Sequence, residues 1–505
     1  MISLLSERLT WPLVAALALF AGGLTASYFL FLKPVYNIFF HPLKIYPGPK
    51  LWAASELPWG FAWMSGKLHL RLMELHDKYG AVVRVGPNEL SYGVPEAWED
   101  IFGRYKPGVR QENPKPSWYC SPDHHDIVGA ALGDHGRMRR LLHQGFTNSA
   151  MLEQEPLIRG HVDLFIQRLH ERSDDGKAVI DMFQWFVYCT FDIIGDLSFG
   201  EPFGCLRESA MHPWITWVFA NIHLTHVFLL CKRNPFFYIF MPVMATVELF
   251  KEYEEHQKTL KAVCDKRMAL ETGRPDFMQV MMSKKGSLYL TPEEIYSNAT
   301  LLTMGGSETT SNTLSGLAYI LAINSVVKKK ITDELRATFT REDEINMRST
   351  AKLPYLVAVI EELMRYFPPG PNSMPRITPP EGNSILGKWV PGNTVLGIPH
   401  RVMYRSERNF KRANEFIPER WLNEGEDSEF ASDRRDGFHP FSYGPRECLA
   451  QNLAYAEMRF ILSRLVWNFD IEIDEQSREW IDHQRAYLIW EKPALFVHLK
   501  AKEKV

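Results

Sequence analysis

The sequence predicts a mainly α-helical protein with small β-sheets, preceded by one N-terminal transmembrane helix. Three observations support this fold class. Apolar residues recur at helical spacing along many segments, β-like stretches are short and clustered, and residues 11–32 carry no charge. Of the 505 residues, 46% are hydrophobic and 23% are charged, which is typical of a globular core and excludes a disordered chain.

The uncharged segment, residues 11–32, is long enough to cross a membrane. At ~1.5 Å per residue, a helix of this length matches the ~30 Å hydrocarbon core of a bilayer. A cleaved signal peptide is the alternative, but it would have a shorter apolar region and a basic start, whereas here Arg8 is balanced by Glu7. We therefore expect a short tail over residues 1–10 and an uncleaved anchor over residues 11–32.

The segment after the anchor indicates where the rest of the chain lies. Three lysines precede the first acid, Glu56, and such basic flanks are typical of the cytosolic side of a membrane. The motif Pro47-Gly48-Pro49 breaks any helix, so residues 33–50 are expected to form a proline-rich elbow. Residues 51–505 are then expected to form one large, mainly helical domain, because no linker or internal repeat divides them.

Charge and cysteine content exclude two further classes. The net charge is -3, from 57 basic and 60 acidic residues, so the basic excess usual in nucleic-acid-binding proteins is lacking and no nucleic acid partner is expected. The six cysteines include no CxxC pair, which excludes a disulfide-dense secreted scaffold and fits a reducing compartment. Most of them should be small buried hydrophobic residues.

The domain itself is expected to be built mostly from helices. Short β-like pieces are expected near 81–93, at Ile385–Val390 and at Val395–Ile398. Residues 103–126 are rich in proline and predict a long loop, and 210–240 an aromatic loop region. Helices are predicted over 66–79, 133–146, 155–172, 181–198, 240–271, 293–324, 326–339, 353–367 and 449–467.

One stretch, the Phe-Ser-Tyr-Gly-Pro-Arg-Glu-Cys-Leu-Ala motif at residues 441–450, has the features of a ligating cysteine. A thiolate needs N–H donors or positive charge nearby. Gly444 permits a tight turn, Arg446 supplies a cation, and a helix beginning at Leu449 would direct its positive end at Cys448. A buried cysteine near a turn is the alternative. Phe, Gly, Arg and Cys at this spacing, however, are expected by chance only ~0.001 times in a chain of this composition.

This motif resembles the haem-binding loop of the cytochrome P450 family, F-x-x-G-x-R-x-C-x-G. Ala450 replaces the final glycine, a mild change because alanine is the better helix former. The resemblance implies a cytochrome P450 fold in which Cys448 is the axial ligand of the iron of haem b (iron protoporphyrin IX). Phe441 and Arg446 would then lie beside the cofactor.

A second motif, Gly305-Gly306-Ser307-Glu308-Thr309-Thr310, resembles the family's A/G-G-x-D/E-T-T and lies in a predicted helix. Two glycines inside a helix cost about 1 kcal/mol each relative to alanine, so they need a reason, such as the close approach of a flat cofactor. A helix with a packing groove is the alternative. We expect Gly305 to border the haem, and Glu308 and Thr309 to be the catalytic pair that delivers protons to oxygen.

A third motif, E-x-x-R, is formed by Glu362 and Arg365, which lie at i,i+3 on an apolar predicted helix. A solvated pair is the usual alternative, but an apolar helix indicates burial, where an unpaired charge is costly. The resemblance adds Arg420 from the later Pro-Glu-Arg-Trp element. All three are expected to hold the cysteine loop in place without taking part in the chemistry.

Basic residues are expected to bind the two haem propionates. His135 and Arg139 are spaced as the family's W-x-x-x-R, with His in place of Trp, and a solvated basic helix face is the alternative. Arg376 and Arg446 match two further propionate-binding positions of the family. Arginine forks suit carboxylates because they donate two parallel hydrogen bonds.

The resemblance covers nearly the whole chain, and several segments are similar to fungal members that tailor secondary metabolites. It implies a haem-thiolate monooxygenase at the endoplasmic reticulum membrane that inserts one atom of O2 into a lipophilic small molecule, such as a terpenoid or polyketide, by hydroxylation, epoxidation or a related oxidation. NADPH electrons would arrive through a separate NADPH–cytochrome P450 reductase, since the chain has no flavin or NAD motif, with cytochrome b5 as a further donor. The reductase is expected to dock on the cysteine side, through Arg139, Arg140, Arg434 and Arg435.

Two alternatives stay open at this point. Some family members act as isomerases or dehydratases without a reductase, but they often lack the acid–threonine pair that this chain has. A non-catalytic membrane haem protein is the second alternative. The sequon Asn298-Ala299-Thr300 lies in a predicted helix and is expected to be unglycosylated.

Overall fold

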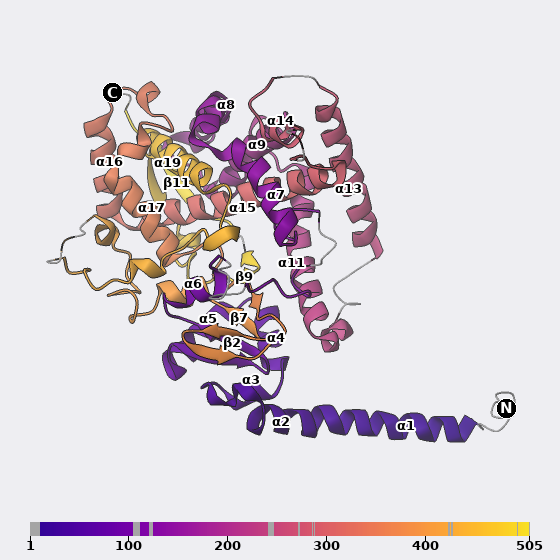
Figure 1. Ribbon diagram of the computed structural model, residues 1–505. Helices are drawn as coiled ribbons and strands as arrows, with labels where there is room; N and C mark the ends of the chain where they lie inside the picture. Colours follow the sequence, from indigo (N-terminus) through magenta and orange to yellow (C-terminus); the bar gives the residue numbers. More distant parts are fainter. Residues whose placement is uncertain are drawn as a thin grey trace.

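An apolar helical rod projects from one end of a larger helical body (Figure 1). The computed structural model describes residues 11–104, 112–120, 125–240, 247–270, 273–284, 286, 288–422, 425, 428–491 and 493–503. The rod consists of α1 (Trp11–Ser27), a π-helical turn (Tyr28–Leu32) and α2 (Lys33–Phe39). The helix therefore continues past residue 32, where the elbow was expected to begin. Pro34 stands at the start of α2, directly after the wider π turn, where a proline is accommodated without ending the helix.

The bend itself lies over residues 40–49 and is fixed to the first strand, β1 (Val82–Gly86). The N–H of Arg84 donates to the carbonyl of Pro47 at 2.8 Å. A Cβ added to Gly48 would lie 2.3 Å from the carbonyl oxygen of Arg84, so only glycine fits there. The Arg84 guanidinium also donates to the carbonyl of Asn37 at 2.9 Å, which ties the end of the rod to the sheet.

A four-stranded sheet lies next to the rod and joins distant parts of the chain (Figure 1). Its order is β1, β2 (Glu89–Tyr92), β7 (Val395–Gly397) and β4 (Arg376–Ile377), with β2 and β7 parallel and the other pairs antiparallel. Arg376 is thereby placed beside the N-terminal strands. Three helices lie near this sheet: α3 (Lys50–Ala54), α4 (Leu57–Met64) and α5 (Leu68–Tyr79).

The remaining strands form small sheets. The stretch expected at Ile385–Val390 is a hairpin, β5 (Asn383–Ile385) and β6 (Lys388–Val390), because Leu386 and Gly387 adopt φ of 52° and 69° and reverse the chain. A three-stranded sheet that the sequence did not predict joins β3 (Ile180–Asp181), β11 (Phe496–Ala501) and β8 (Phe469–Ile473). A short pair, β9 (Ala486–Tyr487) and β10 (Ile489–Trp490), completes the strands.

The long central helix α15 (Pro292–Ile323) organises the helical body (Figure 1). A capping box between Thr291 and Glu294 begins it, and it packs against α9 (Met182–Phe199) and α19 (Gln451–Asn468). The other helices are α6 (Ala97–Phe102), α7 (Leu132–Leu142), α8 (Asn148–Ser173), α10 (Cys205–Glu208), α11 (Pro213–Arg233), α13 (Val247–Met268), α14 (Phe277–Met281), α16 (Ser325–Thr338), α17 (Pro354–Tyr366) and α18 (His400–Tyr404). The mainly α class with small sheets is confirmed.

One region differs clearly from its prediction. Residues 210–240, expected to be an aromatic loop, contain α11, which begins at Pro213 and is capped by the side chain of His212. By length and composition alone, Ala15–Phe39 and α11 could each cross a membrane, but α11 is partly buried against the body, as a core helix would be. The prediction failed because α11 is apolar on most sides and so lacks a clear polar face.

Candidate functional site

The predicted cysteine loop, residues 441–450, leads directly into α19. The N–H of Cys448 donates to the carbonyl of Phe441 at 2.8 Å, which closes the loop. Gly444 has a φ of 80°, and a Cβ there would lie 2.2 Å from the carbonyl oxygen of Phe102, so conformation and space both require glycine. The helix begins at Gln451, slightly later than the expected Leu449, and its N-terminus still lies beside the cysteine.

The charges around Cys448 differ from the expectation. The Cys448 side chain is exposed, but the protein packed around the loop desolvates its thiol and raises the thiol pKa, while the N–H of Ala450 and the charge of Arg139 oppose this with smaller effects. Arg446, expected to be the nearby cation, instead donates to the carbonyl of Ala130 at 3.0 Å and pairs with Glu112 at 3.3 Å. The loop alone therefore does not make the thiol acidic. A bound metal cation would supply the charge that stabilises a thiolate.

The four predicted basic residues lie close together, and Lys115 joins them as a fifth. The predicted four are His135, Arg139, Arg376 and Arg446. Burial, and then the charges of Arg446, Arg139, Lys115 and Arg376, lower the pKa of His135 to about 4, so His135 is neutral. Lys115 was not predicted, because an isolated lysine in a long loop carries no motif; its ammonium donates to the carbonyl of Val128 at 2.5 Å. Arg139 also donates to the carbonyl of Glu447 at 2.6 Å, which links this cluster to the cysteine loop.

These residues fit a haem. Arg376 is only 4% exposed, yet its Nη1 has no hydrogen-bond partner among the described residues. Two carboxylates would satisfy this donor and balance the surplus of positive charge around it. A Cβ added to Gly305 would meet nothing within 4 Å in the described part of the chain, so α15 borders open space at that point. Haem is a flat dianion at its propionate edge, and both features suit it.

The acid–threonine motif lies in the middle of α15. The hydroxyl of Thr309 donates to the carbonyl of Gly305 at 2.7 Å, and its side chain is partly exposed. Glu308 is 3% exposed, so the two neighbours face different surroundings. Gly306 has a different role from Gly305, because a Cβ there would lie 2.7 Å from Cδ1 of Ile194 on α9. Gly306 thus allows the two helices to approach closely.

The E-x-x-R residues form a closed buried network. Glu362, Arg365 and Arg420 are all 0% exposed. Arg365 donates to both Glu362 oxygens at 2.8 Å, and Arg420 donates to Glu362 at 3.2 Å. Two members were missed from the sequence: Asp433, which accepts from Arg420 at 2.5 Å, and Trp421, whose indole donates to Glu362 at 2.9 Å. Asp433 shares no motif with Glu362, and Trp421 was given no role although it ends the Pro-Glu-Arg-Trp element, so the fold is needed to show these two bonds.

The comparisons with known proteins agree with this geometry. Residues 47–498 match the family model described as Cytochrome P450. The chain belongs to the cytochrome P450 family. It is 60% identical to cytochrome P450 monooxygenase bet2 of Neocamarosporium betae over 96% of this chain and 94% of that protein. Averantin hydroxylase of Dothistroma septosporum is 38% identical (96% and 91% covered), and trichothecene C-15 hydroxylase of Fusarium sporotrichioides is 39% identical (97% and 98% covered).

Membership fixes the class of chemistry. Relatives in this family are named monooxygenase and hydroxylase, and the chain is a P450 monooxygenase of the fungal secondary-metabolism type. Membership of the family implies a haem cofactor.

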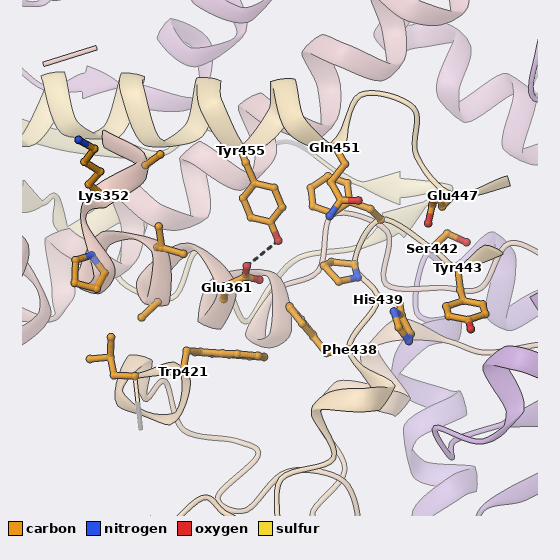
Figure 2. A pocket seen from close by; sticks show the side chains of 17 residues that line it. Lys352, Glu361, Trp421, Phe438, His439, Ser442, Tyr443, Glu447, Gln451 and Tyr455 are labelled. Atoms are coloured by element: carbon orange, nitrogen blue, oxygen red, sulfur yellow. Dashed lines mark hydrogen bonds between the residues drawn. The ribbon is translucent and has the colours of Figure 1, made fainter. Parts of the chain in front are cut away.

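A groove of about 950 Å³ lies between the P450 cysteine loop, α17 and α19 (Figure 2). Figure 2 shows Tyr455 of α19 pointing at Glu361 of α17, and its hydroxyl donates to that carboxyl at 2.8 Å. Burial raises the pKa of Glu361 to about 7. Aromatic side chains from the loop, including Phe438 and Tyr443, form much of the remaining wall.

The arginines expected to contact a reductase are mostly engaged within the chain. Arg434 pairs with Glu96 and Asp436 at 2.8 Å each, and Arg435 donates to the carbonyl of Arg420. Arg139 is held by Glu447, as described above. Arg140 bonds to the carbonyl of Gly136 on its own helix. Carboxylates therefore face Arg139 and Arg434, whereas Arg140 and Arg435 bond to neutral carbonyls and keep their charge.

The sequon is used structurally. Asn298 is 0% exposed; its side chain accepts from the N–H of Ile127 at 3.0 Å and donates to the carbonyl of Glu294 at 2.7 Å. A sugar cannot be attached to this amide in the folded chain. The asparagine instead fastens residues 125–127 to α15.

Proposed function

We propose that the chain is a membrane-anchored haem-thiolate monooxygenase that oxidises a neutral or weakly polar lipophilic metabolite with O2. The observation that carries this proposal is the combination of a cysteine loop at the N-terminus of α19 with a cluster of basic side chains, in which Nη1 of the buried Arg376 has no hydrogen-bond partner among the described residues. Relatives named for averantin and trichothecene hydroxylation support hydroxylation of a secondary metabolite, with terpenoids and polyketides as the candidate classes.

Each predicted residue is assigned a role within this proposal. Cys448 is the axial ligand, and Phe441 and Gly305 border the two faces of the cofactor. When bound, a thiolate-ligated haem supplies the activation of O2. His135, Arg139, Arg376 and Arg446 are proposed to hold the propionates, together with Lys115. Their surplus of positive charge supports this role.

Proton delivery is assigned to Thr309 and Glu308. The Thr309 hydroxyl hydrogen is held by the Gly305 carbonyl, and rotation of the side chain would direct it into the open space beside Gly305. Glu308 at the preceding position is the acid that would resupply the proton. The buried network of Glu362, Arg365 and Arg420 is assigned no chemical role. It positions the polypeptide beneath the cysteine loop.

Electron supply and membrane attachment complete the proposal. NADPH electrons are proposed to arrive from a separate reductase, with cytochrome b5 as a second donor, on the side of the groove in Figure 2. The exposed apolar helix of residues 15–39 supports a single anchor in the endoplasmic reticulum membrane, with the catalytic domain in the cytosol. Residues 1–10, the proposed tail, lie outside the described part of the chain.

The test is the absorption spectrum of the full chain. We expect the reduced, carbon monoxide-bound wild type to show the band of thiolate ligation and Cys448→Ala to lack it. Cys120→Ala, which removes a cysteine from the long loop, is the matched control and should keep the band. A thiolate band in Cys448→Ala would refute the assignment. Turnover that needs neither NADPH nor reductase would favour the isomerase or dehydratase alternative.

A further inference from the structure

A small cavity is lined by residues of α4, α11 and β2. Its volume is about 30 Å³, which suits one water-sized group. The wall is formed by α4, the end of α11, the strand β2 and the loops around residues 118 and 372. Its lining includes Trp59, Trp63, Trp118, Glu89, Arg233 and Asn372.

Three polar atoms in this wall have no hydrogen-bond partner among the described residues. They are Nη1 of Arg233 and both amide atoms, Oδ1 and Nδ2, of Asn372. The Arg233 side chain is only 5% exposed, so bulk water does not satisfy its donor. Buried polar atoms in folded proteins nearly always have a partner, either protein, water or ligand. A group with matching hydrogen-bond capacity therefore belongs in the cavity.

The other atoms of Arg233 hold its orientation. Its Nε donates to Glu56 at 2.8 Å, and its Nη2 donates to Glu56 at 2.6 Å and to Glu89. The guanidinium carbon stacks 3.7 Å from the ring of Trp59. The remaining arm, Nη1, is thus preorganised rather than free to search for a partner.

The charge and the donor count select the kind of group. Two carboxylates already face the single guanidinium, so an anionic ligand would add a further negative charge to a buried site. The unpaired atoms are two donors and one acceptor. A hydroxyl accepts two hydrogen bonds and donates one, so it satisfies all three. A carbonyl or ether would leave the Asn372 oxygen unpaired, and a hydrocarbon would leave all three unpaired.

Two of the chain segments that line the cavity also contain residues of the basic cluster. Asn372 lies four positions before Arg376 on the same strand-forming segment, and Trp118 lies three positions after Lys115. Both Arg376 and Lys115 belong to the basic cluster described above. The cavity wall and the cofactor-binding residues therefore share two segments of chain.

We propose that Arg233 and Asn372 form a subsite that binds a hydroxyl group of the substrate at a distance from the carbon that is oxidised. This inference rests on the proposed monooxygenase function. It assigns the substrate to the neutral lipophilic alcohols or phenols. The cavity admits the hydroxyl alone, so the apolar part of the substrate lies outside it.

The experiment compares alcohols with their deoxy counterparts. The probes are farnesol with farnesene, menthol with menthane, and naphthalenemethanol with methylnaphthalene, together with the methyl ether of each alcohol. Binding to the full-length haem-loaded protein is followed by the substrate-induced shift of the haem absorption band. The variants are Asn372→Leu, which removes both polar atoms of the side-chain amide at similar volume, and Arg233→Lys, which keeps the charge opposite Glu56 and Glu89 but removes Nη1.

For the wild type we expect at least one alcohol to bind about tenfold more tightly than both its deoxy counterpart and its methyl ether. Asn372→Leu should abolish this preference without changing hydrocarbon affinity, and Arg233→Lys should reduce it. Asn148→Leu, at an exposed asparagine that begins α8, is the matched control and should bind as the wild type does.

Two outcomes would overturn the subsite. If no alcohol in the series is preferred by the wild type, the cavity does not bind a substrate hydroxyl. If Asn372→Leu lowers the melting temperature but leaves the alcohol preference intact, the cavity holds a structural water only. The thiolate band of the reduced, carbon monoxide-bound protein separates these outcomes from failure of the proposed function, since that band does not depend on the subsite.

Discussion

The buried arginines around Glu362 and those of the basic cluster differ in how fully their hydrogen bonds are satisfied. Around Glu362, the donors of Arg365 reach Glu362 and the carbonyls of Tyr404, Ala413 and Glu415, all between 2.8 and 2.9 Å. In the basic cluster, Arg376 is almost as deeply buried, but its Nη1 has no partner among the described residues. A satisfied network is complete as protein, whereas an unsatisfied one is complete only with a ligand.

The charge balance shows the same difference. Glu362 and Asp433 match Arg365 and Arg420, so the first network is neutral as a unit. In the second cluster, positive groups crowd one another: burial, followed by the charge of Arg446, lowers the pKa of Arg376 to about 10. We therefore read the first cluster as scaffold and the second as a binding site for an anion. Substitutions can separate these two interpretations.

The largest effect is expected from Glu362→Ala. Removing this carboxyl leaves two buried guanidinium groups without their shared partner, which costs about 3–5 kcal/mol. The variant should lose most of its folded, haem-containing yield, and the loss should appear equally in the apoprotein. Chemical denaturation of both forms and the haem content of the purified protein measure it.

The neighbouring residue provides the control for that prediction. Glu361 lies on the same helix but faces the groove, and burial raises its pKa to about 7, so its neutral form is favoured by the fold. A raised carboxyl pKa makes the wild type lose stability as the pH rises from the unfolded-state value to about 7. Glu361→Gln mimics the neutral acid and should match or exceed wild-type stability above neutral pH. Equal damage from both substitutions would contradict a special role for Glu362.

An intermediate effect is expected from Arg376→Met, which should not weaken the apoprotein but should weaken the binding of haem. In the apoprotein the change removes a buried donor without a partner, whose burial costs about 1–3 kcal/mol, so stability should stay equal or rise. In the haem-loaded protein it removes charge-assisted hydrogen bonds, so haem should be lost about tenfold faster. Denaturation of apoprotein made under haem limitation and transfer of haem to apomyoglobin measure the two effects. Destabilisation of both forms would place Arg376 in the scaffold instead.

Local motifs explain which parts of this comparison could be predicted. Glu362 and Arg365 are one helix turn apart, and Gly444 and Cys448 share one loop, so spacing alone brought each set together. Asp433 was missed because nothing in its sequence neighbourhood connects it with Glu362. Lys115 was missed because it is an isolated lysine in a long loop, with no motif that connects it with the other basic residues. Arg446 was placed beside the thiol from its proximity in sequence, whereas Glu112 and the carbonyl of Ala130 direct its side chain elsewhere.

Fold elements follow the same rule. Helices with a clear polar face, such as α16 and α17, were predicted to within a few residues. The strands β3, β8 and β11 were missed because they pair across long separations in sequence, and short strands are stabilised by that pairing rather than by their own pattern. The rod extends to Phe39 because Pro34 is tolerated after the π turn, which charge counting could not show.

The smallest change in stability is expected from alanine substitutions at two adjacent glycines of α15, Gly305 and Gly306. A Cβ at Gly305 would meet nothing within 4 Å among the described residues, while a Cβ at Gly306 would lie 2.7 Å from Cδ1 of Ile194. Gly305→Ala should therefore stabilise the apoprotein by about 0.5–1 kcal/mol through helix propensity. Gly306→Ala should destabilise it by about 1–3 kcal/mol through overpacking, and Ile194→Val, which removes Cδ1, should relieve part of that cost. Thermal denaturation is compared for four apoproteins: the wild type, Gly305→Ala, Gly306→Ala and the double variant Gly306→Ala with Ile194→Val. If Gly305→Ala is as damaging as Gly306→Ala, the space beside Gly305 is already filled by protein. A flat cofactor could not then meet the helix at that point.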